Sequence, residues 1–442
     1  MAARYARLYW SLAACMFAGV AFAGENWPQW RGPDQNGISD STGLPETWSE
    51  TENIVWKVEL PSWSGSSPVV WGDRILVTSP TQGETPTDKS RFLNPGGDGL
   101  LLLCLSRKDG STLWQVELDS GNHLGRKQNA TSPTPVTDGK NIWVITGTGT
   151  VALLTMDGAV VWKQNFQKDY GQVGTNFGYA TSPLIHDGKV IVQVLHGYKT
   201  DDPSYIMAYD AMKGDVLWRV ERPTDALSET PDAYNTPTIL GEGADAQIIV
   251  CGGGFVSGHD PKNGQEIWRA SGLDPKRDEY YRTIASAIAV DGMVYAPTRQ
   301  KPLLAIRGGG KGDVTESHLA WKWDEAYGPD VPTPACDGKY FYMVDDKGVA
   351  TCLDAKTGAV IWGPEHTARG AVSASPIVAD GKLYITNEDA VTSVLAAGPT
   401  FKAIATNTLP GEGHTLSTMA VAGNQIFMRT PSHLYCIAKA AK

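Results

Sequence analysis

The residues Ala350–Trp362 (ATCLDAKTGAVIW) join two short strand-like runs through a tight turn. The first run ends at Asp354, the turn ends in Gly358, and the second run is apolar. Clear copies of the phrase are Met207–Trp218 and Ser257–Trp268, and weaker copies end at Trp114 and Trp162. A hairpin that returns at intervals of about fifty residues predicts a repeat architecture.

A second phrase recurs between these hairpins. It consists of a serine or threonine, usually followed by proline, then a glycine-containing turn and an apolar strand. Its eight copies begin at Ser67, Ser132, Ser182, Thr236, Ser286, Thr333, Ser375 and Thr418. The two phrases together supply four antiparallel strands per repeat, because an Asp-Gly turn between two β runs is a strong hairpin signal. We therefore predict an all-β, eight-bladed propeller with four-stranded antiparallel blades.

The two ends of the chain complement one another. The eighth repeat supplies only three strands, the last of them at Leu434 to Ile437, and lacks the terminal tryptophan. One strand with a tryptophan, residues 53–60 around Trp56, stands before the first repeat. We expect this strand to close the eighth blade, which removes an exposed strand edge. The predicted organisation is an extended N-terminal arm over residues 24–52 and the propeller over residues 53–442.

The first 23 residues have the pattern of a secretory signal peptide. Arg4 and Arg7 precede an apolar run that is short for a membrane span, and Ala21-Phe22-Ala23 matches a cleavage site. We expect cleavage after Ala23 and a periplasmic or extracellular protein. The alternative is a lipoprotein attached through Cys15, because Leu12-Ala13-Ala14-Cys15 resembles a lipidation box.

The composition fits a protein of short strands and turns. Glycine (48), proline (27) and tryptophan (15) are abundant, charged residues make up 19%, and the net charge is −10. No basic stripe is present, which argues against nucleic acid as a partner. Of the six cysteines, no two are adjacent or spaced as Cys-x-x-Cys. We interpret those after the signal segment as buried apolar side chains; a disulfide such as Cys336–Cys352 stays open.

The phrase from Leu353 to Gly358, followed by Trp362, resembles the tryptophan-docking repeat of pyrroloquinoline quinone (PQQ) propellers. It is similar also to the repeat of the propeller lipoprotein of the outer-membrane β-barrel assembly machinery. The arm Trp27-Pro28-Gln29-Trp30-Arg31-Gly32-Pro33 resembles that of secreted bacterial PQQ-binding-like β-propeller proteins. We expect the repeat tryptophans to wedge between neighbouring blades. These residues are Trp56, Trp114, Trp162, Trp218, Trp268 and Trp362.

The strands of each repeat are named A to D from the channel outward. In a propeller the D–A and B–C loops share one face, and here these loops are long and irregular, so we expect binding on this long-loop face. Residues that enter the A strands line the mouth of the channel. Counting back from each Ser/Thr anchor gives a candidate ring of ligand-binding residues: Asn129, Tyr179, Asn235, Arg282, Asp330, Arg369 and His414, with Ser64 and Tyr234 beside them. The alternative interpretation is an ordinary solvated rim.

The resemblance implies PQQ with calcium as a cofactor, but the sequence lacks much of what an active quinoprotein dehydrogenase needs. A polycarboxylate such as PQQ requires cations and a metal site, for which Arg282, Arg369, Asp330 and Asn129 are the candidates. The adjacent cysteine pair of those enzymes is absent, and so is a Cys-x-x-Cys-His haem site. No His-x-x-x-His pair, P-loop or Gly-x-Ser-x-Gly elbow occurs. We therefore assign no catalytic and no metal-binding residue, and no cofactor is firmly implied.

Three hypotheses for function follow. The leading one is an exported, monomeric, non-catalytic propeller that binds a partner protein or a small ligand on its long-loop face. The alternative is a PQQ- and calcium-dependent dehydrogenase of alcohols or sugars. The third is carbohydrate binding through aromatic loop residues, namely Tyr170, Phe177, Tyr179, Tyr280 and Tyr281.

Overall fold

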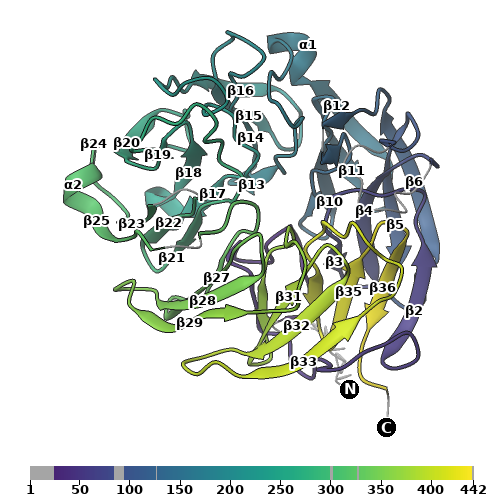
Figure 1. Cartoon of the computed structure of the whole chain (residues 1–442). Helices are drawn as coiled ribbons and strands as arrows, with labels where there is room; N and C mark the ends of the chain where they lie inside the picture. The colour runs from purple at the N-terminus through teal and green to yellow at the C-terminus, as the bar shows by residue number, and fades with distance from the viewer. Residues whose placement is uncertain (1–23, 84–93, 126, 299–301, 326–327, 441–442) are drawn as a thin grey trace, which may run out of the picture.

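The computed structural model describes residues 24–83, 94–125, 127–298, 302–325 and 328–440, so the predicted signal peptide and Cys15 lie outside the described residues. Eight four-stranded antiparallel sheets form a ring (Figure 1), which confirms the predicted eight-bladed β-propeller. In these ranges, helices are limited to α1 (Phe166–Tyr170), α2 (Thr315–His318) and the 3-10 turn η1 (Gly243–Asp245). In the described part of the chain, no helix has the length and apolar character needed to cross a membrane.

Each blade runs from an inner A strand to an outer D strand. Blade 1 contains β3 (Val69–Trp71), β4 (Arg74–Pro80), β5 (Leu100–Ser106) and β6 (Thr112–Asp119). Blade 2 contains β9 (Val136–Thr137), β10 (Asn141–Ile145), β11 (Thr150–Thr155) and β12 (Val160–Asn165). Blade 3 contains β13 (Leu184–His186), β14 (Lys189–Val194), β15 (Tyr205–Asp210) and β16 (Val216–Glu221). Blade 4 contains β17 (Thr238–Leu240), β18 (Gln247–Gly252), β19 (Phe255–His259) and β20 (Glu266–Ser271).

Blade 5 contains β21 (Ile288–Val290), β22 (Met293–Ala296), β23 (Leu303–Arg307) and β25 (Leu319–Trp323). Blade 6 contains β26 (Ala335–Cys336), β27 (Tyr340–Val344), β28 (Val349–Asp354) and β29 (Val360–His366). Blade 7 is β30 (Ile377–Ala379), β31 (Lys382–Thr386), β32 (Val391–Ala396) and β33 (Ala403–Thr408). Two short strands add parallel edges: β1 (Ile38–Ser39) beside β30 and β24 (Gly312–Asp313) beside β20.

Blade 8 is built from both ends of the propeller sequence. It contains β34 (Ala420–Ala422), β35 (Gln425–Arg429), β36 (His433–Ile437) and the N-terminal β2 (Ile54–Glu59). Strand β2 pairs antiparallel with β36 and places Trp56 opposite Cys436, and the two strands lie side by side in Figure 1. The predicted closure of the ring by the N-terminal strand is confirmed.

A closed belt of eight hydrogen bonds connects the A strands. At each blade the backbone N–H of the Ser/Thr anchor donates to the hydroxyl of the next blade's anchor, at 2.8–3.1 Å. The chain of bonds runs through Ser67, Thr134, Ser182, Thr236, Ser286, Thr333, Ser375 and Thr418, and back to Ser67. The prediction was wrong at blade 2, where Thr134 and not Ser132 is the anchor. Both residues precede a proline, and pattern alone does not separate the two registers.

Outer-strand tryptophans reach the next blade at most interfaces. The indole N–H of Trp56, Trp114, Trp162, Trp218, Trp321 and Trp362 donates to a backbone carbonyl of the following blade at 2.9–3.2 Å. Trp321 also packs on Gly358, where an added Cβ would lie 2.7 Å from the indole ring and where φ is +73°. Trp268 differs, because its N–H donates to Gln247 of its own blade at 2.7 Å. Trp321 was missed in the sequence because a glycine-rich insertion, Gly308 to Gly310, interrupts that repeat.

The N-terminal arm supplies the aromatic ring that blade 7 lacks. Ala405 stands opposite Val394, where other blades carry the docking tryptophan. Trp48 of the arm is buried in the core shared by blades 7 and 8 and stacks on Tyr384 with 6.4 Å between ring centroids. Its backbone N–H donates to Asn407 Oδ1 at 2.9 Å. The arm therefore stabilises blade 7, whose own D strand carries no docking tryptophan.

The first part of the arm crosses the short-turn face of the ring. It exchanges backbone hydrogen bonds with blade 1 through Trp27, with blade 2 through Pro28, with blade 6 through Asn36 and with blade 7 through Gly37. The Arg31 guanidinium, 3% exposed, donates to the carbonyls of Pro334 (2.6 Å) and Pro376 (3.0 Å). These contacts fix the arm beneath the channel.

The five cysteines in the described residues are free thiols, and all are buried. Cys336 and Cys352 therefore form no disulfide. Burial raises the pKa of the Cys352 thiol to about 12, since the thiolate would be poorly solvated.

The belt predicts a specific stability loss. Thr333→Val removes the hydroxyl that accepts the Ser286 N–H (2.8 Å) but keeps the side-chain shape. A buried amide left without an acceptor costs about 1–3 kcal/mol, so the urea midpoint should fall clearly. Thr333→Ser keeps the hydroxyl and serves as the control, with a smaller shift. A valine variant as stable as the serine variant would contradict the belt's role.

Candidate functional site

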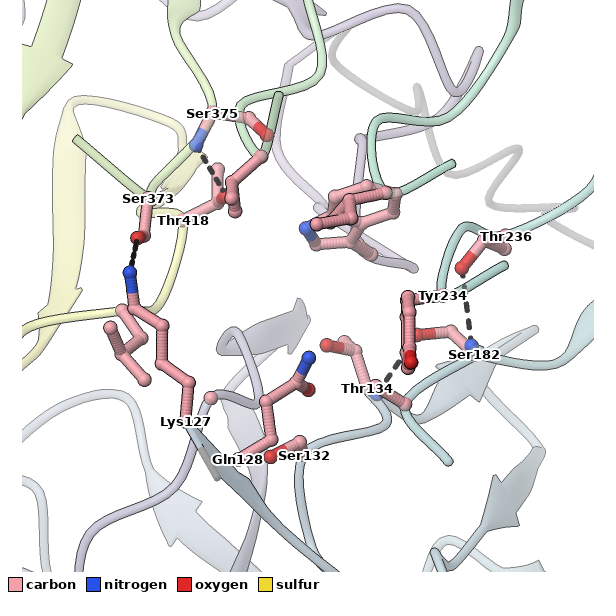
Figure 2. Close-up of a pocket in the computed structure, with 16 residues that line it drawn as sticks. Lys127, Gln128, Ser132, Thr134, Ser182, Tyr234, Thr236, Ser373, Ser375 and Thr418 are labelled. Atoms are coloured by element: carbon pink, nitrogen blue, oxygen red, sulfur yellow. Dashed lines mark hydrogen bonds between the residues drawn. The ribbon is translucent and has the colours of Figure 1, made fainter. Parts of the chain in front are cut away.

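The channel contains a small chamber above the N-terminal arm. Its volume is about 120 Å³, and Trp30 of the arm contributes to its lining. Figure 2 shows the labelled side chains around it, with dashed hydrogen bonds between successive belt residues. Five belt residues line the chamber: Thr134, Ser182, Thr236, Ser375 and Thr418.

A hairpin from the loop between blades 1 and 2 reaches over this chamber. It is formed by β7 (Leu124–Gly125) and β8 (Gln128–Asn129). Lys127 donates to Ser373 Oγ of the loop before blade 7 at 2.7 Å and forms an ion pair with Glu388. Burial alone would raise the pKa of Glu388, but the Lys127 ammonium holds it below its usual value. The hairpin is therefore tied across the channel by a charged contact.

A second cavity of about 560 Å³ opens beside the hairpin at the mouth of the channel. It shares Lys127, Gln128, Tyr234, Ile284 and Val331 with the chamber, so the two spaces are neighbours along one path. Its other walls carry charged and aromatic groups. These residues are Phe177, Arg282, Asp330, Asp345, Asp346 and Lys347.

The mouth has a cationic and an acidic wall. The Arg282 guanidinium lies 4.7 Å from the Phe177 ring centroid and 3.6 Å from the Glu229 carboxylate. On the other wall, Asp346 Oδ1 accepts the backbone N–H groups of Asp330 (3.2 Å) and Val331 (3.1 Å). Burial, reinforced by the Asp330 charge, raises the pKa of Asp346 to about 6. Such an arrangement can bind polar or charged groups of a ligand.

Of the predicted ring, Arg282 and Asp330 line this mouth, together with Tyr234 beside it. Asn129 donates to Trp63 O (2.8 Å), Tyr179 donates to Gln193 O (3.0 Å), and Asn235 donates to Cys251 O (2.9 Å). All three are buried and hold neighbouring segments together. Arg369 is exposed, and His414 packs edge-on against Trp63 at 5.1 Å. The structure thus places the predicted residues in several environments.

Sequence reasoning missed Trp30, Lys127 and Asp346. Trp30 lies in an arm without strand pattern, so nothing in the repeat count points to the channel. Lys127 lies two residues before Asn129, on a loop whose hairpin is too short to recognise. Asp346 lies in a B–C loop, whereas the predicted ring was counted back from the A strands and included its spatial neighbour Asp330 instead.

The aromatic residues considered for carbohydrate binding do not share a surface. Tyr179 and Tyr281 are buried, Tyr170 packs under Arg219, and Phe177 packs under Arg282. Only Tyr280 is largely exposed, at 59%. These residues form no common stacking platform.

The described residues of the channel offer no grouped metal-ligand set for calcium beside PQQ. The chamber is smaller than the roughly 300–1,000 Å³ typical of sites for drug-sized ligands, whereas the mouth, at about 560 Å³, falls within that range. Within residues 24–83, 94–125, 127–298, 302–325 and 328–440, no three His, Cys, Asp or Glu side chains are grouped so as to hold a metal ion. The sequence also contains no adjacent cysteines to cover such a cofactor.

Comparison with known proteins gives one family. A family model described as outer membrane protein assembly factor BamB matches residues 97–362 and 313–399. BamB of Yersinia pestis is 24% identical over 366 residues, which cover 76% of this chain and 81% of that protein. BamB of Alkalilimnicola ehrlichii is 27% identical over 168 residues, which cover 35% of this chain and 40% of that protein.

Solved structures share the fold. BamB from Moraxella catarrhalis aligns with a TM-score of 0.60 at 14% identity, covering 87% of this chain and 99% of that one. A europium-containing methanol dehydrogenase aligns with 0.68 at 12% identity, covering 94% and 98%. Quinohemoprotein alcohol dehydrogenase from Comamonas testosteroni aligns with 0.62 at 11% identity, covering 95% and 81%. At these identities the similarity concerns the fold alone.

The raised pKa of Asp346 predicts a pH-dependent stability. Because its pKa is higher in the folded chain than in the unfolded one, stability falls as the pH rises through about 6. Asp346→Asn mimics the protonated form and keeps an acceptor for both N–H groups. The variant should be more stable than the native chain at pH 8, by on the order of 1–3 kcal/mol, and similar at about pH 3, below the pKa of aspartate in the unfolded chain.

Urea unfolding at the two pH values measures this difference. The charges that face Asp346 are Asp330, Asp345, Lys347 and Lys127. Asp201→Asn is the control, since it removes one carboxylate charge at an exposed position. Equal stability of Asp346→Asn and the native chain at pH 8 would rule out the assigned burial of this carboxylate.

Proposed function

The chain belongs to the PQQ-like β-propeller family described as outer membrane protein assembly factor BamB, and we propose that it is an exported, non-catalytic scaffold. On this proposal it works in the periplasm or outside the cell and binds a partner protein, or a small ligand, on its long-loop face. The names of its relatives describe factors that assist other proteins. A protein partner is therefore the first choice.

The observation that carries this proposal is an exposed apolar surface on the long-loop face. Tyr198 (40% exposed), Leu227 (44%) and Tyr280 (59%) come from three loops of blades 3 to 5. Hydrogen bonds join these loops: the Tyr198 backbone N–H donates to the Asp232 carboxylate (Oδ1) at 3.1 Å, and the Glu229 N–H donates to Glu279 O at 2.8 Å. Large exposed apolar side chains held on one rigid surface are typical of protein-binding sites.

The other large exposed apolar side chains differ from Tyr198, Leu227 and Tyr280 in their location. They lie on the outer strands and one turn, at Val55, Leu113, Val160, Val161, Met212, Val216, Leu217 and Val360. In the D strands they stand beside the docking tryptophans, where strand propensity explains them. The surface around Tyr280 has no such structural reason.

The second candidate is a PQQ- and calcium-dependent dehydrogenase of alcohols or sugars. The dehydrogenases that share the fold favour it. The lack of a grouped metal-ligand set among the described residues weighs against it. We rank it second for that reason.

Site-specific photocrosslinking in the native host tests the scaffold proposal. A photoreactive phenylalanine replaces Tyr280 on the long-loop face, and the matched control replaces Met212 (53% exposed) on a turn of the opposite face. We expect a discrete crosslinked protein from position 280, lost when Leu227→Asp and Tyr198→Asp are added. Equal products from both positions, or none from position 280, would contradict the proposal.

A further inference from the structure

The belt hydroxyls have hydrogen-bond donors that the protein does not use. Each hydroxyl accepts one backbone N–H, and a hydroxyl also carries one O–H donor. Across the residues that the structure describes, none of the eight belt hydroxyls donates to a protein acceptor. A buried donor without an acceptor is unfavourable by about 1–3 kcal/mol. These O–H groups therefore require acceptors that do not belong to the chain.

Five of these hydroxyls converge on the chamber above Trp30. Thr134, Ser182, Ser375 and Thr418 are each no more than 5% exposed, and Thr236 completes the set. Ser132 adds a sixth hydroxyl, which accepts the Asn129 N–H (3.3 Å) and donates to no described residue. Gln128 and Lys127 contribute amide and ammonium donors from above. The wall of the chamber is thus rich in donors.

A positively charged residue, Arg31, follows Trp30 in the arm. The carbonyls that bind the Arg31 guanidinium belong to Pro334 and Pro376, which follow the belt residues Thr333 and Ser375. Burial lowers the pKa of Arg31 to about 9, so the group stays protonated at neutral pH. Within the described ranges, no carboxylate lies within ion-pair distance of Arg31. A buried cation without a counter-charge favours an anion nearby.

The size of the chamber limits what it can hold. Its volume of about 120 Å³ is somewhat smaller than a cavity of about 150 Å³ that binds benzene. It could equally hold about four water molecules, at roughly 30 Å³ each. A compact ion with acceptor oxygens on all sides would match the ring of hydroxyl donors better than an elongated ligand.

We propose that the chamber between Trp30 and the Lys127–Gln128 hairpin binds one small inorganic oxyanion of the sulfate or phosphate type. The belt hydroxyls and the Gln128 amide donate to its oxygens, and Arg31, the residue after Trp30, supplies a positive charge that no described carboxylate compensates. The oxyanion enters from the mouth, past Tyr234 and Val331. This site does not depend on the partner surface around Tyr280, so either proposal can fail while the other stands.

Crystallisation with sodium selenate tests the site, because selenate has the shape of sulfate and its selenium gives an anomalous signal. We expect one anomalous peak inside the chamber, within hydrogen-bond distance of the Thr236 and Thr418 hydroxyls. Water alone in the chamber, or selenium peaks only at the molecular surface, would overturn the proposal. The unaltered chain decides this outcome without any variant.

Calorimetric titration with sulfate at constant ionic strength gives the matching affinity. Ala180→Leu fills the chamber without removing a hydrogen-bonding side chain and should weaken binding by about tenfold or more. Lys347→Met removes a charge from the mouth only and is the control, with affinity unchanged within about threefold. Sulfate that binds Ala180→Leu as tightly as the native chain would place the ion elsewhere and overturn the proposal.

Discussion

The hydrogen-bond belt at the start of the A strands fixes the geometry of the whole ring. Each blade gives one backbone N–H to its neighbour's hydroxyl, and the last bond, from Thr418 to Ser67, joins the eighth blade to the first. The tryptophans act farther out, where each indole N–H reaches a carbonyl of the following blade, as Trp321 does at Ala355. Together the inner and outer contacts set the angle between blades, and the long loops take their positions from that frame.

Strand β2 closes the ring of blades, and the N-terminal arm covers one end of the central channel. Strand β2 completes blade 8, Trp48 compensates for the missing tryptophan of blade 7, and Arg31 holds the arm beneath the channel. The channel is consequently approached from the long-loop face, past the Lys127 hairpin. This arrangement separates a small polar interior from a larger surface suited to a protein partner.

The fold was predictable because its signals are periodic, whereas most of the site was not. Alternating apolar runs, Asp-Gly turns and repeated tryptophans each point to the same four-stranded blade, so local errors such as Ser132 for Thr134 leave the architecture unchanged. A polar side chain at a loop end has no such redundancy. Asn129 and Asn235 turn toward neighbouring backbone, while Arg282 faces the mouth, and only tertiary contacts decide between these outcomes. Trp30 reaches the channel from a segment that shows no repeat at all.

The central claim is that this propeller binds a partner protein or a small ligand and does not catalyse a redox reaction. Titration of the purified chain with PQQ and Ca²⁺, followed by dye reduction with alcohols and aldose sugars, tests it most directly. We predict no saturable change in tryptophan fluorescence and no turnover, because the described residues contain no grouped metal-ligand set for calcium. Stoichiometric PQQ binding with sustained dye reduction, lost in Arg282→Ala, would contradict it.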